Sequence, residues 1–85
     1  MFLYMIRNTN DELYVGISNE PKKRLDHHNS KRGAYLTHAG NFKIVFLEEH
    51  SSIEAARKRE VQIKKWSRVK KDFLIDLYNK GQATK

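Results

Sequence analysis

Two short apolar segments joined by a polar turn are the feature that most constrains how this chain can fold. Residues 2–6 and 13–17 alternate with a period of two and are rich in residues that favour strands. The segment between them, residues 7–12, is polar and prone to turns. The first 17 residues therefore predict an antiparallel β-hairpin.

A short helix is expected directly after the hairpin. Ser18 or Asn19 can cap it, and Pro21 is tolerated in its first turn. The helix should run to about Asn29, and residues 30–41 then form a loop. Leu25 and Pro21 are its expected packing residues.

Residues 42–47 form the strongest predicted strand of the chain. The segment is apolar on both faces near its middle. A strand of this kind is usually buried on both faces, so we expect it to be central in the sheet or covered on both sides.

Two helices are expected to complete the chain. Ser51 and Glu54 have the spacing of a capping box, which predicts a helix that runs to about Trp66. Ser67 can cap a last helix over residues 69–79. The side chains expected to face inward are Ile53, Ala56, Ile63 and Trp66 on the first of these helices, and Val69, Phe73, Leu74, Leu77 and Tyr78 on the second.

The order of elements is β-β-α-β-α-α, and its simplest packing is an α+β domain with a three-stranded sheet flanked by helices. At 85 residues the chain can build one core, so we expect a single domain over residues 1–80 and a frayed tail over 81–85. The absence of cysteine excludes disulfides and thiolate metal sites. No apolar run approaches the ~20 residues of a membrane span, and we expect a cytoplasmic protein.

The charge balance points to a polyanionic partner. Seventeen Lys and Arg against ten Asp and Glu give a net charge of +7, and nucleic acid is the commonest polyanion in a cytosol. Eight of these basic residues lie in residues 57–59 and 64–71. Most are expected to face solvent, either as a track for a nucleic-acid backbone or simply as a solvated helix face. Trp66 among them either stacks on a base or closes the core between the last two helices.

Glu60 is the first candidate functional residue, because it falls on the apolar side of its helix. A buried carboxylate is costly unless it is paired or binds a metal. Arg57 and Lys64 lie at helical spacing from Glu60 and make an ion pair easy. The residues alone leave the ion pair and the metal site as alternatives.

Tyr4, Tyr14 and Gly16 form the second candidate group, on the predicted hairpin. Two strand tyrosines most often simply pack in a sheet. A glycine inside a short strand, however, often marks the close approach of a backbone or a ligand. Gly16 lies two residues from Tyr14 and so shares its face, where a phenol beside open sheet could hold a water.

Arg24 and His28 form the third group, four residues apart on the first helix. Taken singly they indicate a solvated basic face. Together, the planar guanidinium suits a phosphate and the imidazole could donate to the same phosphate or to a leaving group.

These residues together resemble a known family. Their order and spacing match the residues that define GIY-YIG nuclease domains, and the match runs from Phe2 to about Ile75. The matching positions are Tyr4, Tyr14-Val15-Gly16, Arg24, His28-Asn29 and Glu60. Residues 59–68 resemble the small stand-alone bacterial members of the superfamily, a group whose function is uncharacterised.

The resemblance implies a mixed antiparallel sheet with the third strand inside it, and cleavage of phosphodiester bonds with one Mg²⁺ or Mn²⁺ ion. In the family a glutamate ligates the metal, an arginine binds the scissile phosphate, and a tyrosine positions or deprotonates the attacking water. These roles correspond to Glu60, Arg24 and Tyr14 here, with Tyr4 and His28 in support.

The chain departs from the family pattern in two places. Its first motif reads Phe2-Leu3-Tyr4, so only the tyrosine is retained. Several family nucleases carry an asparagine in the last helix, in a region where this chain has Asp72, with Asn79 further on. These departures leave the predicted fold untouched and bear on catalysis alone.

The residues and the resemblance together predict a monomeric metal-dependent endonuclease acting on DNA, whose specificity is low, structural or supplied by a protein partner. Two alternatives stay open: a nucleic-acid-binding module of the same fold that does not cut, and an adaptor that docks on a protein. The expected nucleic-acid-binding residues are Lys22, Lys23, Lys31, Arg32, Arg57 and Lys64.

Overall fold

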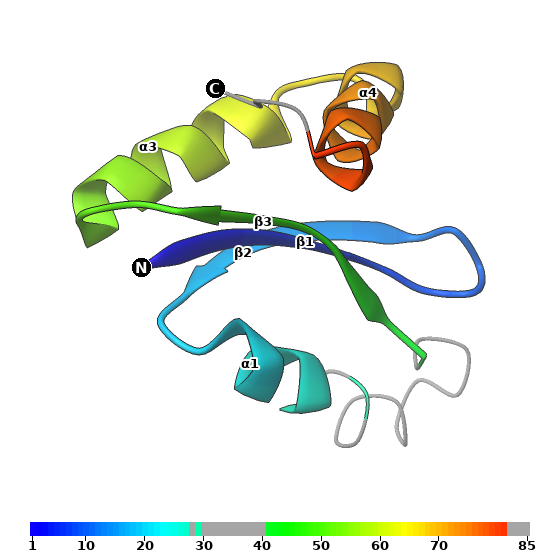
Figure 1. The fold of residues 1–85 in the computed structure, drawn as a ribbon, viewed down its shortest axis with the longest axis horizontal. Helices are drawn as coiled ribbons and strands as arrows, with labels where there is room; N and C mark the ends of the chain where they lie inside the picture. The colour runs from blue at the N-terminus through cyan, green and yellow to red at the C-terminus, as the bar shows by residue number, and fades with distance from the viewer. Residues whose placement is uncertain (28, 30–40, 82–85) are drawn as a thin grey trace.

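The computed structural model describes residues 1–27, 29 and 41–81 (Figure 1). Its elements are β1 (Phe2–Arg7), β2 (Leu13–Ser18), α1 (Pro21–His27), β3 (Lys43–Glu49), α3 (Ile53–Lys64) and α4 (Arg68–Asn79). The predicted order β-β-α-β-α-α and the α+β class are confirmed. Most of the expected loop at 30–41 and of the expected tail lie outside the described residues. Within the described ranges, no helix is long and apolar enough to cross a bilayer.

The sheet has the strand order β2-β1-β3, and both pairings are antiparallel. The predicted hairpin is confirmed, but the expectation that the third strand lies inside the sheet is wrong. β1 is the central strand and β3 lies at an edge. The other expectation, burial on both sides, agrees with the structure, because Phe46 packs in one core and Ile44 and Leu47 pack against the other.

A β-bulge explains why two residues of β3 that are two positions apart lie on opposite faces of the sheet. Met5 pairs with Phe46 whereas the next residue, Ile6, pairs with Ile44, so Val45 is an extra residue on β3. A bulge of this kind shifts the alternation of side chains along one strand. Phe46 consequently packs under α3 and α4, whereas Ile44 packs on the α1 side.

The sheet separates two clusters of buried side chains. Helices α3 and α4 cover one face, and α1 lies against the other (Figure 1). The α3/α4 core is built on Leu3, Met5, Phe46, Ile63, Leu74 and Ile75, all buried. Among the described residues, the α1 core has three buried side chains, those of Tyr4, Ile6 and Phe42.

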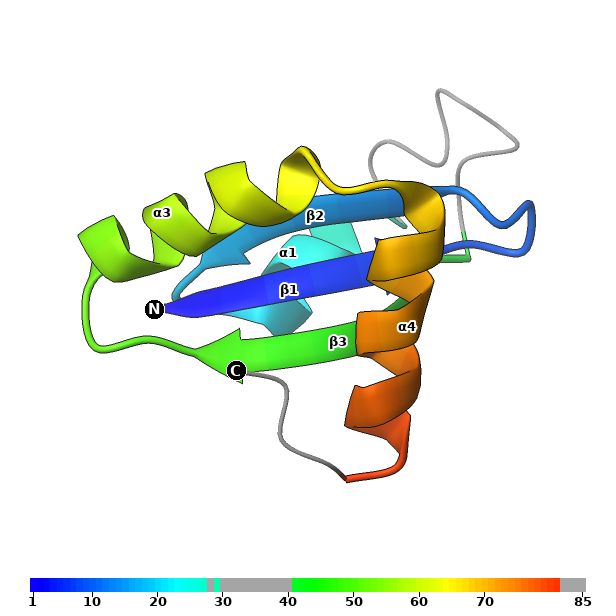
Figure 2. The same cartoon turned by 90° about the horizontal axis from the view of Figure 1, so that it is seen from above.

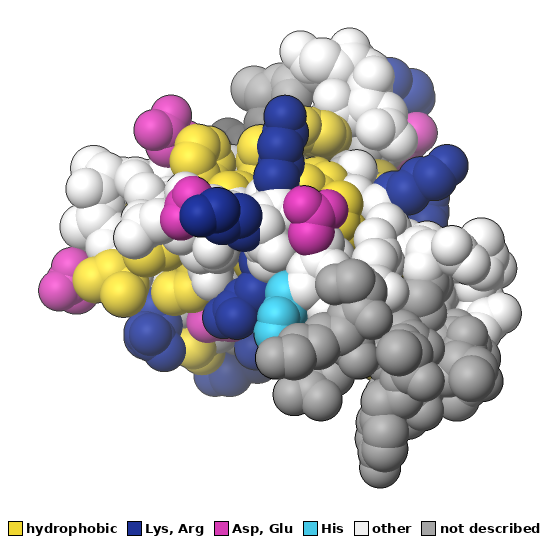
Figure 3. All heavy atoms as spheres, turned by 90° about the horizontal axis from the view of Figure 1, so that it is seen from below, with side chains coloured by type: hydrophobic (Ala, Val, Ile, Leu, Met, Phe, Trp, Pro, Cys, Tyr) yellow, Lys and Arg dark blue, Asp and Glu magenta, His cyan; other side chains and the backbone are white. Residues whose placement is uncertain are grey.

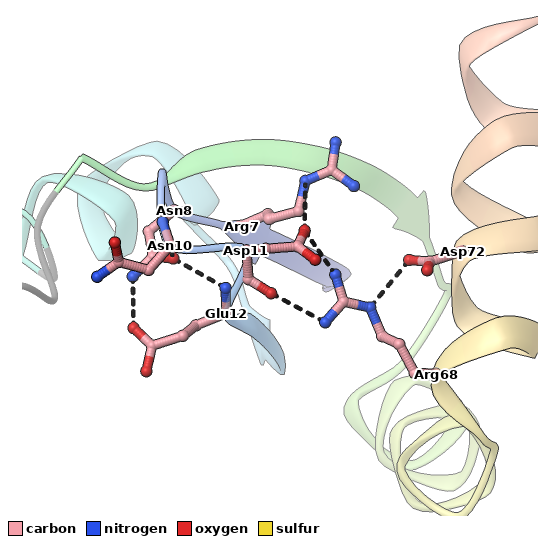
Figure 4. Close-up of polar contacts among 7 residues, drawn as sticks. All are labelled: Arg7, Asn8, Asn10, Asp11, Glu12, Arg68 and Asp72. Atoms are coloured by element: carbon pink, nitrogen blue, oxygen red, sulfur yellow. Dashed lines mark hydrogen bonds and ion pairs between the residues drawn. The ribbon is translucent and has the colours of Figure 1, made fainter.

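The hairpin turn is closed by its own polar side chains (Figure 4). Asn8 Oδ1 accepts from the amides of Asn10 and Glu12, over 3.1 and 2.9 Å. Asp11 has φ of 65°, a left-handed conformation that Asp tolerates better than most residues. Arg68 at the start of α4 then donates to the carbonyl and to Oδ1 of Asp11, both over 2.9 Å. The turn and α4 are thereby tied together.

The helix caps confirm one prediction and correct another. Ser67 caps α4 as expected, because its hydroxyl accepts from the amide of Lys70. The cap of α3 is Ser52 and not Ser51, since the Ser52 hydroxyl accepts from the amide of Ala55 over 3.1 Å. The helix begins one residue later than the capping-box pattern indicates, so Glu54 lies inside the first turn.

The inward face of α4 differs from the expected one. Val69 and Phe73 are 79% and 63% exposed, whereas Leu74 and Ile75 are buried. The two faces of this helix are both partly apolar, so helical periodicity alone did not select the phase. Tyr78 lies between these extremes, because its ring packs on Phe46 at a centroid distance of 5.4 Å.

The inward face of α3 is closer to the prediction. Ala56 and Ile63 are buried and Trp66, just beyond the helix, packs against the same core. Ile53 is the exception at 45% exposed, because it stands at the helix start.

Candidate functional site

The Tyr4 phenol lies directly against Gly16. The two residues are partners in the β1–β2 ladder, and Tyr4 is buried. A Cβ placed on Gly16 would come within 2.6 Å of the Tyr4 hydroxyl oxygen and 2.8 Å of the ring carbon that bears it. No other residue type fits there without displacing the phenol. Sequence reasoning predicted a close approach at Gly16, and the approaching group is a side chain.

Tyr14 shares the face of Tyr4 and Gly16 but remains at the surface. It pairs with Ile6 on β1 and is 47% exposed. Its ring packs edge-on against Phe42, with centroids 5.4 Å apart and an interplanar angle of 71°. T-shaped aromatic contacts of this kind fix ring orientation. Tyr4 is therefore buried over β2, whereas Tyr14 lies at the surface of the same face.

Helix α1 presents Arg24 to solvent on the same side of the sheet. Leu25 anchors the helix in the small core, and Arg24 beside it is exposed. Lys22 and Lys23 in the first turn are also exposed, and Lys23 pairs with Glu20 over 3.4 Å. The other predicted residues of this region, His28, Lys31 and Arg32, lie outside the described residues.

Glu60 is on α3, which covers the opposite face. Its side chain is 13% exposed, so it is shielded but reachable by water. At about 100° per residue, Glu60 and Arg59 flank opposite sides of the stripe that buries Ala56 and Ile63. Arg59 bonds to Glu48 on β3 over 3.1 Å. Glu60 therefore faces away from β3, toward the β2 edge.

The arrangement of α3 supports this placement. Figure 2 shows α3 running alongside β2, on the side of the sheet away from β3. The Tyr4 phenol lies over Gly16 of the same strand on the other face. The phenol and the Glu60 carboxylate thus approach the β2 edge of the sheet from its two faces.

Glu60 also makes the ion pair that its spacing predicts. Lys64 Nζ lies 3.1 Å from Glu60 Oε2, and the lysine side chain is 54% exposed. Such i, i+4 pairs contribute only about 0.3–0.5 kcal/mol, so a stronger ligand can displace the lysine. Among the described residues, no group of three or more His, Asp or Glu side chains is placed to hold a metal.

Two of the eight clustered basic residues are not available to a ligand in this arrangement. Arg59 bonds Glu48, and Arg68 bonds Asp11 and Asp72. The hydrogen bond and charge of Asp72, helped by Asp11, raise the pKa of Arg68 above its usual value. Arg59 and Arg68 therefore link elements of the fold to one another.

Two cationic side chains lie close to the ring of Trp66. Arg59 lies 5.4 Å and Lys70 4.4 Å from the ring centroid, and the ring packs against the larger core. Of the two roles that the sequence left open, closing the core describes Trp66.

On the α1 side of the molecule, the surface cations are dispersed. Figure 3, which views the α1 side, shows Lys and Arg side chains interspersed with acidic ones and not a continuous basic band. Arg57 is on the outer face of α3, where it lines an open hollow of about 420 Å³ with Glu54, Lys58 and Val61. None of the described candidate catalytic side chains lines this hollow.

Sequence reasoning missed a buried charged cluster at the end of β3. Glu48 is 5% exposed and is hydrogen-bonded by His50 over 2.7 Å and by Arg59 over 3.1 Å. The signal was Glu48, two residues after Phe46 and therefore in line with the apolar alternation of the strand. Its partners satisfy the charge, which makes the cluster a structural link between β3 and α3.

The comparisons with known proteins agree with this geometry. A small α+β domain with two tyrosines and a glycine on a hairpin, an arginine on the next helix and a glutamate on a later one is the arrangement of the GIY-YIG class. The family model described as the GIY-YIG catalytic domain matches residues 1–72, and the chain belongs to this family.

Its relatives are bacterial proteins of the UPF0213 group. The chain is 41% identical to a UPF0213 protein of Syntrophus aciditrophicus over 87% of each chain. It is 33% identical to one of Bacillus pumilus, over 88% of this chain and 78% of the relative. It is 31% identical to UPF0213 protein YhbQ of Escherichia coli, over 87% and 75%. No solved structure gives a significant match.

Proposed function

We propose that this protein is a metal-dependent endonuclease that hydrolyses DNA phosphodiester bonds at the β2 edge of the sheet. The observation that carries the proposal is the fit of the Tyr4 phenol over Gly16, with Glu60 turned toward the same edge from α3. A shielded carboxylate and a fixed hydroxyl at one edge are the groups that a metal-assisted attack by water requires. The family membership supports nuclease chemistry in general terms.

Each candidate residue has a role that fits its position. Tyr14 is at the surface, so its hydroxyl positions the attacking water on the incoming strand. Tyr4 is fixed by burial and supports that water from beneath. Arg24 is exposed on α1 and its planar guanidinium binds the scissile phosphate through two N–H groups. Lys22 and Arg57, also exposed, add contacts to flanking phosphates.

Glu60 suits Mg²⁺ or Mn²⁺ as a carboxylate ligand. Mg²⁺ is commonly held by one or two carboxylates together with substrate phosphate and waters. Such an ion, when bound, would polarise the phosphate and stabilise the leaving oxygen. Glu60 would hold the ion once its ion pair with Lys64 opens, and the 54% exposure of the lysine side chain allows that movement.

The test is a cleavage assay with a matched variant. Nicked, branched and single-stranded DNA are incubated with the protein and Mg²⁺, Mn²⁺ or EDTA, beside Glu60→Gln. The amide keeps the size of the side chain and removes its charge. We expect products only from the wild-type protein with metal, and a loss of at least about 100-fold in the variant. Equal products from both proteins, or none from either, would reject the proposal.

A second function, binding of nucleic acid without cleavage, is favoured by one specific observation. Glu60 already has a partner in Lys64, and the chain carries a charge of +7. This function predicts salt-dependent DNA binding that survives Glu60→Gln and EDTA. Binding curves at increasing salt, with and without metal, distinguish the two functions.

A further inference from the structure

Asn29 bridges the end of the first helical segment to the start of β3. Its Oδ1 accepts from the amide of Phe42 over 2.7 Å, and its Nδ2 donates to the carbonyl of the same residue over 3.0 Å. One side chain thus occupies both backbone groups of a residue 13 positions away. These two hydrogen bonds resemble the pair that a residue of a neighbouring β-strand makes.

This double contact explains why the position carries an asparagine. A carboxamide is a short side chain with both an acceptor and a donor at its end. Aspartate at neutral pH accepts only, so it would keep the bond to the Phe42 amide and oppose the Phe42 carbonyl. Alanine would keep neither bond.

Phe42 connects the clamp to the candidate site. Its side chain is 5% exposed and packs in the α1 core with Tyr4 and Ile6. The same ring makes the edge-on contact with Tyr14. The backbone position of Phe42, which Asn29 holds, therefore sets the ring against which Tyr14 is oriented.

We propose that Asn29 is a positioning residue that orients the Tyr14 phenol through Phe42. The proposal rests on the proposed function only for its effect on cleavage. The effect on the Tyr14 ring is independent of whether the protein cuts DNA. Asn29 touches no reacting atom in this account, so it alters the rate by misplacing Tyr14.

The experiment follows the Tyr14 ring by NMR with ¹³C-labelled tyrosine, assigned with Tyr14→Phe. Asn29→Ala should move the Tyr14 ring signals in the same direction as Phe42→Ala, which removes the ring contact itself. Asn79→Ala is the matched control, because Asn79 is exposed at the end of α4 and its change should leave Tyr14 unaltered.

Asn29→Asp supplies the sharper result and remains informative if Asn29→Ala does not fold. At neutral pH its Tyr14 signals should lie between those of the wild-type protein and Phe42→Ala. Below about pH 4 the carboxyl is protonated and regains a donor, so the signals should return to the wild-type position measured at the same pH. Signals that match wild type at all pH values would overturn the proposal.

Cleavage kinetics add a second readout. Asn29→Ala should lower kcat by about tenfold with KM changed less than about twofold, the split expected of a misplaced catalytic group. Unchanged kcat together with unchanged Tyr14 signals overturns the inference. If the wild-type protein does not cut DNA while the Tyr14 signals move as expected, the proposed function fails and the positioning role stands.

Discussion

The two faces of the sheet differ in how many apolar side chains they bury and in the length of the helices that cover them. The α3/α4 face buries six large or medium apolar side chains under two helices of 12 residues each. Among the described residues, the α1 face buries three, one of them a tyrosine, under a helix of seven residues that has no fully buried side chain. We therefore expect the α3/α4 core to contribute more to the free energy of folding, whereas Tyr14 and Arg24 on the α1 side lie near solvent.

The difference between the two faces predicts which property a substitution on each face should change. Polar groups on the α3/α4 side are paired with one another, as in the contacts among Asp11, Arg68 and Asp72 (Figure 4). On the α1 side, Tyr14 and Arg24 are exposed. Changes to the buried side chains of the larger core should therefore alter stability, whereas changes to Tyr14 and Arg24 on the α1 side, and to Glu60 on α3, should alter activity.

The largest expected effect compares one aliphatic side chain from each face. Ile63→Ala removes a side chain with no exposure from α3 and should lower the free energy of unfolding by about 3 kcal/mol. Leu25→Ala on α1 removes a half-buried side chain and should cost about 1 kcal/mol. Urea unfolding followed by circular dichroism measures both. Equal losses would contradict the unequal roles of the two cores.

Gly16→Ala should separate activity from stability. The new methyl group would meet the Tyr4 hydroxyl at 2.6 Å, so the phenol must move. A displacement of about 1 Å can cost about 100-fold in rate, and we expect that loss in kcat for DNA cleavage. Val15→Ala, on the same strand but facing the larger core, is the control and should reduce stability while kcat stays near wild type. The reverse pattern would place the reacting groups on the wrong face.

Removal of the α3 cap should have a smaller effect, confined to stability. Ser52→Ala loses the hydroxyl that accepts from the Ala55 amide and should cost about 1 kcal/mol. Ser51→Ala, one residue earlier, should change the free energy of unfolding by less than about 0.3 kcal/mol. Thermal unfolding of the pair decides which serine is the cap.

The smallest effect is expected where α4 meets the hairpin turn. Arg68→Ala removes partly exposed contacts to Asp11 and Asp72 and should cost about 0.5 kcal/mol. Because the folded protein raises the pKa of Arg68, the stabilisation is complete below the ordinary arginine pKa and is lost only as the pH rises through the raised value. The difference between wild type and variant should therefore be constant from pH 6 to pH 9. A difference that grows steadily with pH across this range would contradict it.

The local sequence pattern predicted the helices and strands well, but it could not predict how the strands pair. Alternation in residues 2–6 and 13–17 identified the hairpin, and Gly16 correctly marked a close approach. The identity of the approaching group depended on the strand register, which the conformation of the turn around Asp11 determines. The register of β3 on β1 likewise includes a bulge at Val45 that leaves no clear signal in the sequence.

The errors share a physical cause. Ser51 and Ser52 are both residues that can cap a helix, and the capping-box spacing favoured the wrong one. On α4, Leu74 is buried as predicted, but Ile75 is buried in place of Val69 and Phe73, because both faces of the helix carry apolar residues. For the site, the i, i+4 rule predicted the pairing of Glu60 with Lys64, but the direction of Glu60 toward β2 came only from the position of Arg59 across the helix.

The central claim is that Glu60 holds a divalent ion at the β2 edge, and paramagnetic broadening by Mn²⁺ tests it most directly. Substoichiometric Mn²⁺ is added to ¹⁵N-labelled protein with a short DNA, beside Glu60→Gln. The amide signals of Gly16 and Glu60 should lose intensity first in the wild-type protein and be spared in the variant. Equal broadening in both proteins, or broadening centred on the Asp11 turn, would contradict the account.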